Sequence, residues 1–253
     1  MYKLYIYFFV CKILDGKGWQ MTYKRIMLKL SGESLAGKKS FGISDEQIQV
    51  YAKMIKQVHE LGVELAIVVG GGNFWRGRTN PNMNRVTADQ IGMLATTMNA
   101  MALNDAILQT GIQSKVMNSI EMPRFVDLFV QNKAVDYLKE KNVLIFAGGT
   151  GNPFFSTDSA AALRAAEIGA EVVLKGTMVD GVYDKDPHQY ADAKKYEEIS
   201  LTEVIAKDLK VMDSTAAALC RDNQIPMLVF SIEDPSNLVK ILKGENLGTL
   251  VKP

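Results

Sequence analysis

The sequence has few residues that can bind a metal ion or form a disulfide. Its 253 residues include only two cysteines, Cys11 and Cys220, and two histidines. Two cysteines without a characteristic spacing do not make a disulfide framework and are typical of a reducing compartment, so we expect a cytoplasmic protein. The shortage of Cys and His side chains nearly excludes a Cys/His zinc site.

The sequence also lacks an excess of either charge. Its 29 Lys and Arg residues balance 28 Asp and Glu residues, which leaves a net charge of +1. A chain this close to neutrality has no overall field that would attract nucleic acid or an anionic membrane surface. We therefore expect neither partner, and any bound anion must be held by local groups.

No apolar run near the N-terminus is long enough to span a membrane. Residues 4–11 are apolar, but a membrane span needs roughly 20 residues, and no small-x-small cleavage site follows. Met21 stands just before the first well-patterned strand, and the codons of Gly16-Lys17-Gly18 must be purine-rich, like a ribosome-binding sequence. We hypothesise that residues 1–20 are a non-native or disordered extension. The alternative is a genuine short N-terminal arm.

From Met21 onward, apolar strand patterns alternate with helical patterns. A capping box at Ser44-Asp45-Glu46-Gln47 opens one helix, and Gly62 is placed to end it. Strands are expected at residues 25–30, 65–69, 112–117, 143–147, 171–174, 227–230 and 249–251. Helices are expected at residues 45–61, 89–110, 123–140, 158–168, 201–206, 213–223 and 235–242.

This alternation predicts an α/β fold in which a mostly parallel central sheet is sandwiched between helices. Continuous apolar strands such as residues 66–69 agree, because strands buried on both faces need not alternate. The chain shows no internal repeat and no Pro/Ser-rich linker. One compact domain over residues 21–253 is therefore expected.

Glycine-rich segments follow three of the expected strands, at residues 29–34, 70–77 and 148–158. Glycine lets backbone N–H groups approach an oxyanion, and ligands of such sheets bind at the carboxyl ends of the strands. One such segment is commonly a plain turn. Three at one sheet edge, together with Lys29, Arg76 and Asp158, predict a cradle for a polyphosphate.

Two familiar nucleotide motifs are nearly matched and are rejected. Residues 32–38 have the spacing of a P-loop, but Lys39 stands where Ser or Thr should bind magnesium, and the following helix starts only near Ser44. Gly70-Gly71-Gly72 is similar to a dinucleotide fingerprint, but Trp75 replaces the third glycine and Asp89 begins a helix.

Five segments resemble the bacterial uridylate (UMP) kinases of the amino-acid-kinase superfamily. They are KLSGE at 29–33, GGGN at 70–73, GTGNPFFSTD at 149–158, KGTMVDGVY at 175–183 and VMD at 211–213. The resemblance runs from about Tyr23 to the C-terminus, and GTGNPFFSTD is specific to the uridylate branch. It implies the reaction ATP + UMP → ADP + UDP with Mg²⁺ in pyrimidine biosynthesis, by a homohexamer that GTP activates and UTP inhibits.

The resemblance also implies roles for three charged residues. Lys29 would stabilise the migrating phosphoryl group, Asp158 would orient Lys29 and the magnesium-bound phosphates, and Asp213 would assist the same network. In-line phosphoryl transfer needs little more than positioning and charge neutralisation. The alternatives are that Lys29 is a surface lysine and that Asp158 merely stabilises the first turn of its helix.

Binding residues carry over by position. The ATP contacts would be Lys29, Leu30, Ser31, Gly32, Gly72, Arg76, Thr177, Tyr183 and Asp186. The UMP contacts would be Gly71, Asp89, Thr150, Gly151, Asn152, Pro153, Phe154, Phe155, Ser156 and Thr157. The GTP loop would be Gly37, Lys38, Lys39, Ser40, Phe41 and Gly42. Mg²⁺ would arrive with ATP, without metal ligands from the chain. The segment around Thr177 and Tyr183 is also compatible with a β-hairpin turning at residues 179–181, and the lysines at 38 and 39 with a solvated turn.

Two other functions are considered. A sibling kinase acting on a carboxylate or carbamate would lack the Asn152-Pro153-Phe154-Phe155 segment. A non-catalytic relative that senses anions would have lost the charged pair Lys29 and Asp158, but both are present. Selectivity for UMP over CMP is left open by the sequence.

Overall fold

The computed structural model describes residues 23–76, 82–209 and 211–253. The hypothesis about residues 1–20 and the alternative start at Met21 lie outside the described residues and stay predictions.

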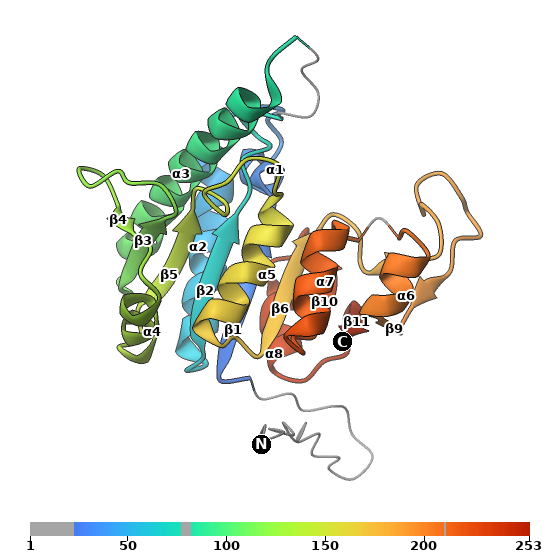
Figure 1. Cartoon of the computed structure of the whole chain (residues 1–253). Helices are drawn as coiled ribbons and strands as arrows, with labels where there is room; N and C mark the ends of the chain where they lie inside the picture. Colours follow the sequence, from blue (N-terminus) through green and yellow to red (C-terminus); the bar gives the residue numbers. More distant parts are fainter. Residues whose placement is uncertain (1–22, 77–81, 210) are drawn as a thin grey trace, which may run out of the picture.

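A nine-stranded sheet forms the centre of the described structure (Figure 1). Every neighbouring pair of strands in it is parallel except β10 with β11. The mostly parallel α/β fold expected from the sequence is therefore confirmed. In spatial order the strands are β4 (Asp127–Leu128), β3 (Ser114–Asn118), β5 (Val143–Ala147), β2 (Glu64–Val69), β1 (Arg25–Leu30), β6 (Val172–Thr177), β10 (Met227–Ser231), β11 (Thr249–Lys252) and β9 (Glu198–Ser200).

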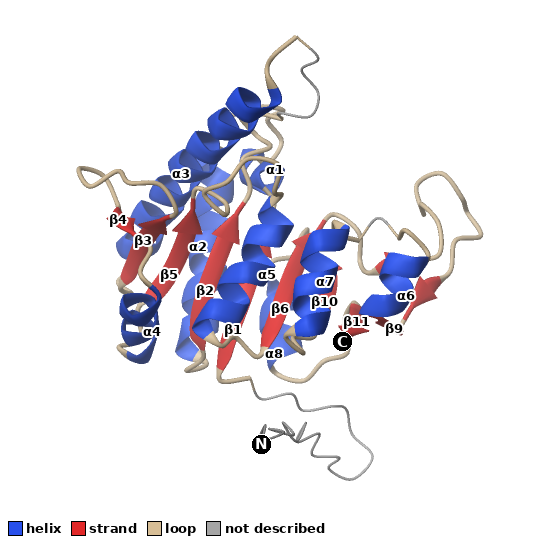
Figure 2. Cartoon of the chain, in the orientation of Figure 1, coloured by secondary structure: helices blue, strands red, loops and turns tan. Residues whose placement is uncertain are grey.

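Helices cover both faces of the sheet (Figure 2). One face packs against α2 (Asp45–Glu60), α3 (Arg85–Gln109) and α8 (Ser236–Leu242). The other packs against α4 (Gln131–Lys139), α5 (Thr157–Ile168), α6 (Leu201–Ala206) and α7 (Ser214–Asp222). No helix within the described ranges combines the length and the apolar character that crossing a membrane requires.

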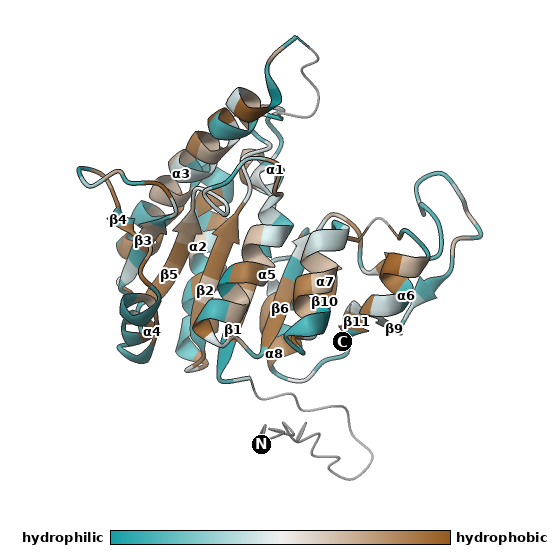
Figure 3. Ribbon diagram, in the orientation of Figure 1, coloured by the Kyte–Doolittle hydropathy of each residue, from teal (hydrophilic) through white to brown (hydrophobic). Residues whose placement is uncertain are grey.

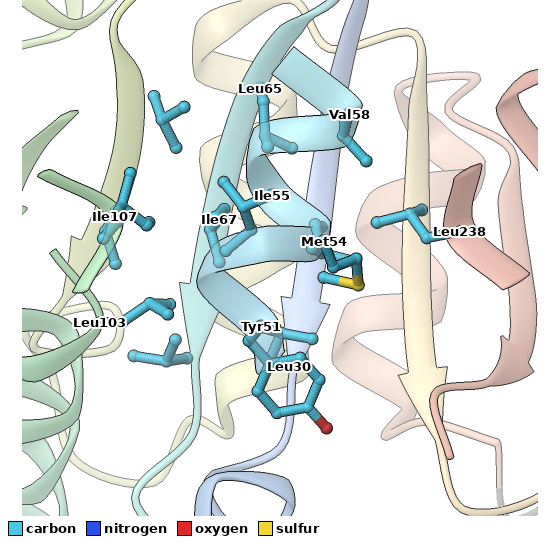
Figure 4. Close-up of a cluster of buried hydrophobic side chains, with 14 of the residues drawn as sticks. Leu30, Tyr51, Met54, Ile55, Val58, Leu65, Ile67, Leu103, Ile107 and Leu238 are labelled. Carbon is cyan, nitrogen blue, oxygen red and sulfur yellow. The ribbon is translucent and has the colours of Figure 1, made fainter. Parts of the chain in front are cut away.

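Alternation along the strands divides the core into two layers. On β1, Ile26 and Leu28 pack toward α2 and α3, whereas Met27 packs toward α5. The same alternation holds on β2, so the central strands are apolar on both faces and appear almost uniformly hydrophobic in Figure 3. Figure 4 shows the first layer, where Tyr51 and Ile55 of α2 lie against the sheet among Leu30, Leu103 and Leu238.

Helix α3 begins earlier than the sequence suggested. It starts at Arg85 instead of Asp89, because the side chain of Asn84 accepts hydrogen bonds from the backbone of Val86 and Thr87 and caps the helix. As a result Asp89 lies within the helix, one turn after Arg85.

The predicted helix over residues 123–140 is wrong in its first half. Asp127 and Leu128 form the edge strand β4, which pairs in parallel with the end of β3, and only α4 is helical. Phe129 supplies the reason: its N–H donates to Asn118 O, and its ring packs edge-on against Phe146 in the core. Tertiary packing outweighs the local helical pattern here.

The possible hairpin at residues 179–181 is not formed. Strand β7 (Val182–Tyr183) pairs with β8 (Lys195–Tyr196) in a separate two-stranded sheet, and β6 pairs with β1 and β10. Short elements that the sequence analysis did not predict are β8, β9 and α1 (Gly32–Ala36). Helix α1 opens where the hydroxyl of its N-cap Ser31 accepts a hydrogen bond from Ser34 N.

Candidate active site

Two lysines lie side by side near the carboxyl ends of the two central strands. Lys29 of β1 and Lys175 of β6 are register partners, and each continues the strand face that packs toward α5. Both are 9% exposed. Adjacent buried ammonium groups repel each other, so this arrangement needs an anion between them.

Asp158 supplies that anion from the first turn of α5. Its Oδ1 lies 2.9 Å from Lys29 Nζ, and its Oδ2 lies 2.5 Å from Lys175 Nζ. One carboxylate thus contacts two ammonium groups, and Asp213 adds a second negative charge that acts on Lys175. Two ammonium groups at the strand ends of a nearly dry site favour binding of an anion such as a phosphoryl group.

The pKa values of this cluster reflect burial and charge together. Burial alone would raise the pKa of the Asp158 carboxyl, but Lys29 and Lys175 outweigh it and hold that pKa below its ordinary value. Burial lowers the pKa of Lys175, and Lys29 lowers it further, while Asp158 opposes both effects. Asp158 is therefore a fixed anion and does not serve as a proton donor near neutral pH.

Asp213 anchors the helix that carries Asp158. It is the N-cap of α7, where its carboxylate accepts from Ala216 N, and it also accepts from the hydroxyls of Ser156 and Ser159 in and before α5. Lys175 is held from the same segment, because its ammonium also donates to Val211 O. Asp213 thus touches the start of α5 and does not contact Lys29 in the described structure.

The glycines after β1 and β2 are packed too tightly for any side chain. A Cβ at Gly32 would lie 2.6 Å from Gly70 O and 2.7 Å from Gly72 N, and one at Gly71 would lie 2.9 Å from Gly92 O. Two buried amides hold this backbone in place: Asn99 donates to Gly70 O and Asn73 Oδ1, and Asn73 donates to Asn99 Oδ1. The packing leaves bare backbone facing α1, as a phosphate loop requires.

A pocket lies beside these glycines, between the start of α3 and the loop that joins β5 to α5. Among the residues that the structure describes, Asp89 is the one charged residue in its lining, and much of the rest is apolar or small. The lining residues are Gly71, Trp75, Ala88, Asp89, Gly92, Met93, Thr96, Gly149, Thr150, Asn152, Phe155 and Thr157. Trp75 Nε1 is buried without a hydrogen-bond partner among the described residues.

Hydrogen bonds from neighbouring elements fix the β5–α5 loop. Thr96 Oγ1 of α3 accepts from Gly148 N at 2.9 Å, and Ser119 Oγ donates to Gly149 O at 2.8 Å. The backbone at Gly148 has φ +74, and a Cβ there would lie 2.1 Å from Asn118 Oδ1. Ser156 caps α5, because its hydroxyl accepts from Asp158 N and Ser159 N in the first turn.

The segment after β6 contains the other predicted nucleotide contacts. Thr177 ends β6, with its hydroxyl donating to Val179 O; the Tyr183 hydroxyl donates to Asp180, and Asp186 lies exposed in the β7–β8 loop. One further predicted contact, Arg76, lies in the loop after β2. Its side chain is exposed and forms a 2.5 Å ion pair with Glu33 of α1.

The loop at residues 37–42 joins α1 to α2. Lys38 and Lys39 are exposed in it. Asn73 ties its end to the glycine loop, because Asn73 Nδ2 donates to Gly42 O at 2.8 Å and Gly42 N donates to Asn73 O. Phe41 meets Phe74 edge-on.

Comparison with known proteins decides the family. Residues 24–231 match the model of the amino acid kinase family. A UMP kinase from Bacillus anthracis superposes with a TM-score of 0.89 at 34% identity, covering 92% of this chain and 97% of that one. A UMP kinase from Ureaplasma parvum gives 0.86 at 38%, covering 92% and 100%, and a uridylate kinase from Archaeoglobus fulgidus gives 0.68 at 30%, covering 89% and 99%.

The chain belongs to the amino acid kinase family. The three solved structures named above are UMP or uridylate kinases at 30–38% identity, so the expectation of a UMP kinase is confirmed. In this amino acid kinase fold the predicted pair Lys29 and Asp158 does meet. Of the residues predicted for UMP, Gly71, Asp89, Thr150, Asn152, Phe155 and Thr157 line one pocket, while Gly151, Pro153, Phe154 and Ser156 lie in the same loop without lining it.

Sequence reasoning missed two important residues of this kinase. Lys175 was read only as part of a motif, although its position at the end of an apolar strand was the same signal that singled out Lys29. Trp75 was used only to reject a dinucleotide motif, yet its ring lines the pocket. No spacing in the sequence pointed to the buried pair Asn73 and Asn99, because their contact is made across α3 and the loop after β2.

Proposed function

We propose that this kinase transfers the γ-phosphoryl group of ATP to UMP by in-line displacement, giving ADP and UDP. The observation that carries the proposal is the buried cluster of Lys29, Asp158 and Lys175, in which two ammonium groups share one carboxylate. A phosphate oxygen of UMP forms the new bond to the γ-phosphorus as the bond to the ADP oxygen breaks. The attacking oxygen is already ionised, so no general base is required.

Lys175, Lys29 and Asp158 would each have a different role in the transfer. Lys175 is anchored by Asp158 and Val211 O, which suits a fixed positive charge beside the phosphates. Within the described structure Lys29 Nζ contacts Asp158 alone, so it has donors left for the transferring phosphoryl oxygens. Asp158 holds both lysines at the same point and adds no proton chemistry.

Acceptor and donor would bind on either side of this cluster. The pocket between α3 and the β5–α5 loop would receive UMP, with Asp89 accepting from ribose hydroxyls. ATP would lie toward β6 and β7, with its phosphates on Ser31, Gly32 and Gly72, and the adenine near Tyr183. In this arrangement the N-terminal part of the domain binds the acceptor UMP, and the C-terminal part binds the donor ATP.

Mg²⁺ would be held by the ATP phosphates instead of by protein carboxylates. Asp158 is already shared by two lysines, and Asp213 accepts from two hydroxyls and a backbone N–H. No group of three or more His, Cys, Asp or Glu side chains in the described parts of the chain is placed to hold a metal ion. The bound ion would neutralise phosphate charge as the phosphoryl group moves.

A second copy of the chain would cover α3. This long helix is apolar on its buried face and also exposes a stripe of Leu94, Met98, Met101 and Leu108. A helix that is apolar on opposite faces is ordinarily buried on both. We therefore place a subunit contact here. We further propose that the enzyme is a cytoplasmic homohexamer. GTP would activate it through residues 37–42, and UTP would inhibit it.

ADP release from ATP–Mg²⁺ with UMP, CMP, AMP or GMP tests the function. We expect rapid ADP release with UMP and much slower release with the purine nucleotides. The variant Lys29→Met, purified in the same way, controls for contaminating kinases. ADP release that does not depend on the added nucleotide would contradict the proposal.

A further inference from the structure

Three groups converge at the mouth of the pocket. Arg85 Nε lies 2.8 Å from both carboxylate oxygens of Asp89, one helical turn along α3. The backbone N–H of Phe154, in the β5–α5 loop, donates to Asp89 Oδ2 at 2.7 Å. The Arg85 guanidinium also lies over the Phe154 ring, 5.5 Å from its centroid. We call these three residues the acceptor clamp.

The clamp holds an unfavourable backbone conformation. Phe154 has φ +73, a region that residues other than glycine rarely occupy. Its side chain is 63% exposed, so burial of the ring does not supply the compensation. The hydrogen bond to Asp89 and the contact with Arg85 are the interactions that the described structure offers instead.

The clamp is continuous with the pocket wall. Asp89 lines the pocket, and Asn152 and Phe155, on either side of the clamped residue, line it as well. Release of Phe154 would therefore disturb two wall residues and remove one of the hydrogen bonds that orient the Asp89 carboxylate. Arg85 controls both effects, because it contacts the carboxylate and the ring at once.

We propose that Arg85 is a positioning residue for the acceptor nucleotide, acting through Asp89 and Phe154. The proposal rests on the assignment of UMP to this pocket. Arg85 holds the Asp89 carboxylate in the orientation that accepts from the ribose and keeps the loop over the bound nucleotide. A nucleoside monophosphate therefore meets a pre-arranged wall and does not have to order it on binding.

A purely structural role would give a different pattern. Arg85 and Asp89 are also an i,i+4 ion pair, and such pairs stabilise helices slightly. If that were all, Arg85→Met would lower the melting temperature a little and leave both Michaelis constants unchanged.

Steady-state kinetics of Arg85→Met separate the two roles. Loss of a partly exposed ion pair and a cation–π contact should raise KM for UMP by about 3- to 10-fold, with KM for ATP and kcat within twofold of wild type. Arg221→Met is the matched control, because Arg221 also forms an exposed ion pair, with Asp222, but at the far end of α7. It should change neither KM.

Hydrogen–deuterium exchange of the nucleotide-free proteins gives a readout that needs no catalysis. A peptide spanning residues 149–157 contains the Phe154 amide, and its exchange should be faster in Arg85→Met than in wild type or Arg221→Met by a factor similar to the rise in KM. Unchanged exchange with unchanged KM for UMP, tighter UMP binding, or equal effects on UMP and ATP would each overturn the proposal. Wild-type protein that fails to phosphorylate UMP would instead overturn the proposed function.

Discussion

Lys29 and Lys175 are register partners on adjacent parallel strands, and their ammonium groups contact opposite oxygens of Asp158. Few arrangements bring two buried like charges so close, because each must be removed from water. The strand pairing fixes their spacing before any ligand arrives. Two ammonium groups held at one point suit the negative charge of a phosphoryl group.

The repulsion between the two lysines predicts that Lys175→Met lowers activity more than stability. The substitution removes the repulsion between the two ammonium groups, but it also takes a partner from Asp158 and from Val211 O. Removing one partner of a buried ion pair ordinarily costs about 3–5 kcal/mol. Because the repulsion between the lysines is relieved, we expect the free energy of unfolding to fall by less than this ordinary cost, together with a large loss of kcat. Urea titration and ADP release measure the two. A strongly destabilised Lys175→Met protein would mean that the second ammonium is needed for folding.

Acid denaturation tests the charge state of Asp158. Its pKa in the folded protein lies below the ordinary value of 3.8, so its ionised form stabilises the fold above that pH, and this contribution is lost as pH falls through the folded pKa. In Asp158→Asn this acid-dependent part should be missing, while stability at pH 7 should be lower because two lysines face each other. Urea titrations at several pH values between 2 and 7 would show parallel curves for both proteins if Asp158 were not ionised in the fold.

Much of this fold could be predicted from local patterns. The central strands are apolar runs bounded by glycine, and α2 has its capping residue Ser44 and its buried stripe in the sequence itself. Helix α4 and strand β4 could not be separated in this way, because Phe129 is held by Asn118 and Phe146, which are distant in sequence. The start of α3 was missed because Asn84 was not recognised as a cap.

The residues of the candidate site that lie directly at strand ends could be predicted from the sequence. Lys29 and the three glycine-rich segments all stand directly after apolar runs, and the structure gathers them at one edge of the sheet. Lys175 occupies the same kind of position, but only the register of β1 with β6 shows that it shares Asp158. The clamp on Phe154 depends on a positive φ and a contact across 65 residues, which no local pattern carries.

Asp89→Ala should weaken UMP far more than ATP. Removing a charged acceptor costs about 1.5–3 kcal/mol, which corresponds to a roughly 10- to 100-fold loss of UMP affinity. Asp89 also holds Phe154 N, so part of the loss comes from the loop. Isothermal titration with each nucleotide measures both affinities. Equal weakening of UMP and ATP would indicate that Asp89 acts only on the structure of α3.

Gly32→Ala should be costly although its backbone conformation is ordinary. The added Cβ would lie 2.6 Å from Gly70 O, so α1 or the glycine loop must move, at a cost of about 1–3 kcal/mol. Gly92→Ala is the matched comparison: nothing lies within 4 Å of its Cβ, and alanine should stabilise α3 by up to about 1 kcal/mol. Melting temperatures compare the two. A Gly32→Ala protein as stable as wild type would show that the loop yields easily.

The most direct test of the mechanism is the turnover of Lys29→Met under saturating ATP–Mg²⁺ and UMP, with UMP affinity measured on the same preparation. If Lys29 stabilises the moving phosphoryl group, kcat should fall by about 10²–10³ while UMP affinity stays within a few-fold. The double variant with Asp158→Asn should be hardly slower than the worse single variant, because the two residues act as one unit. Near-normal turnover of Lys29→Met, or full multiplication of the two losses, would contradict the account.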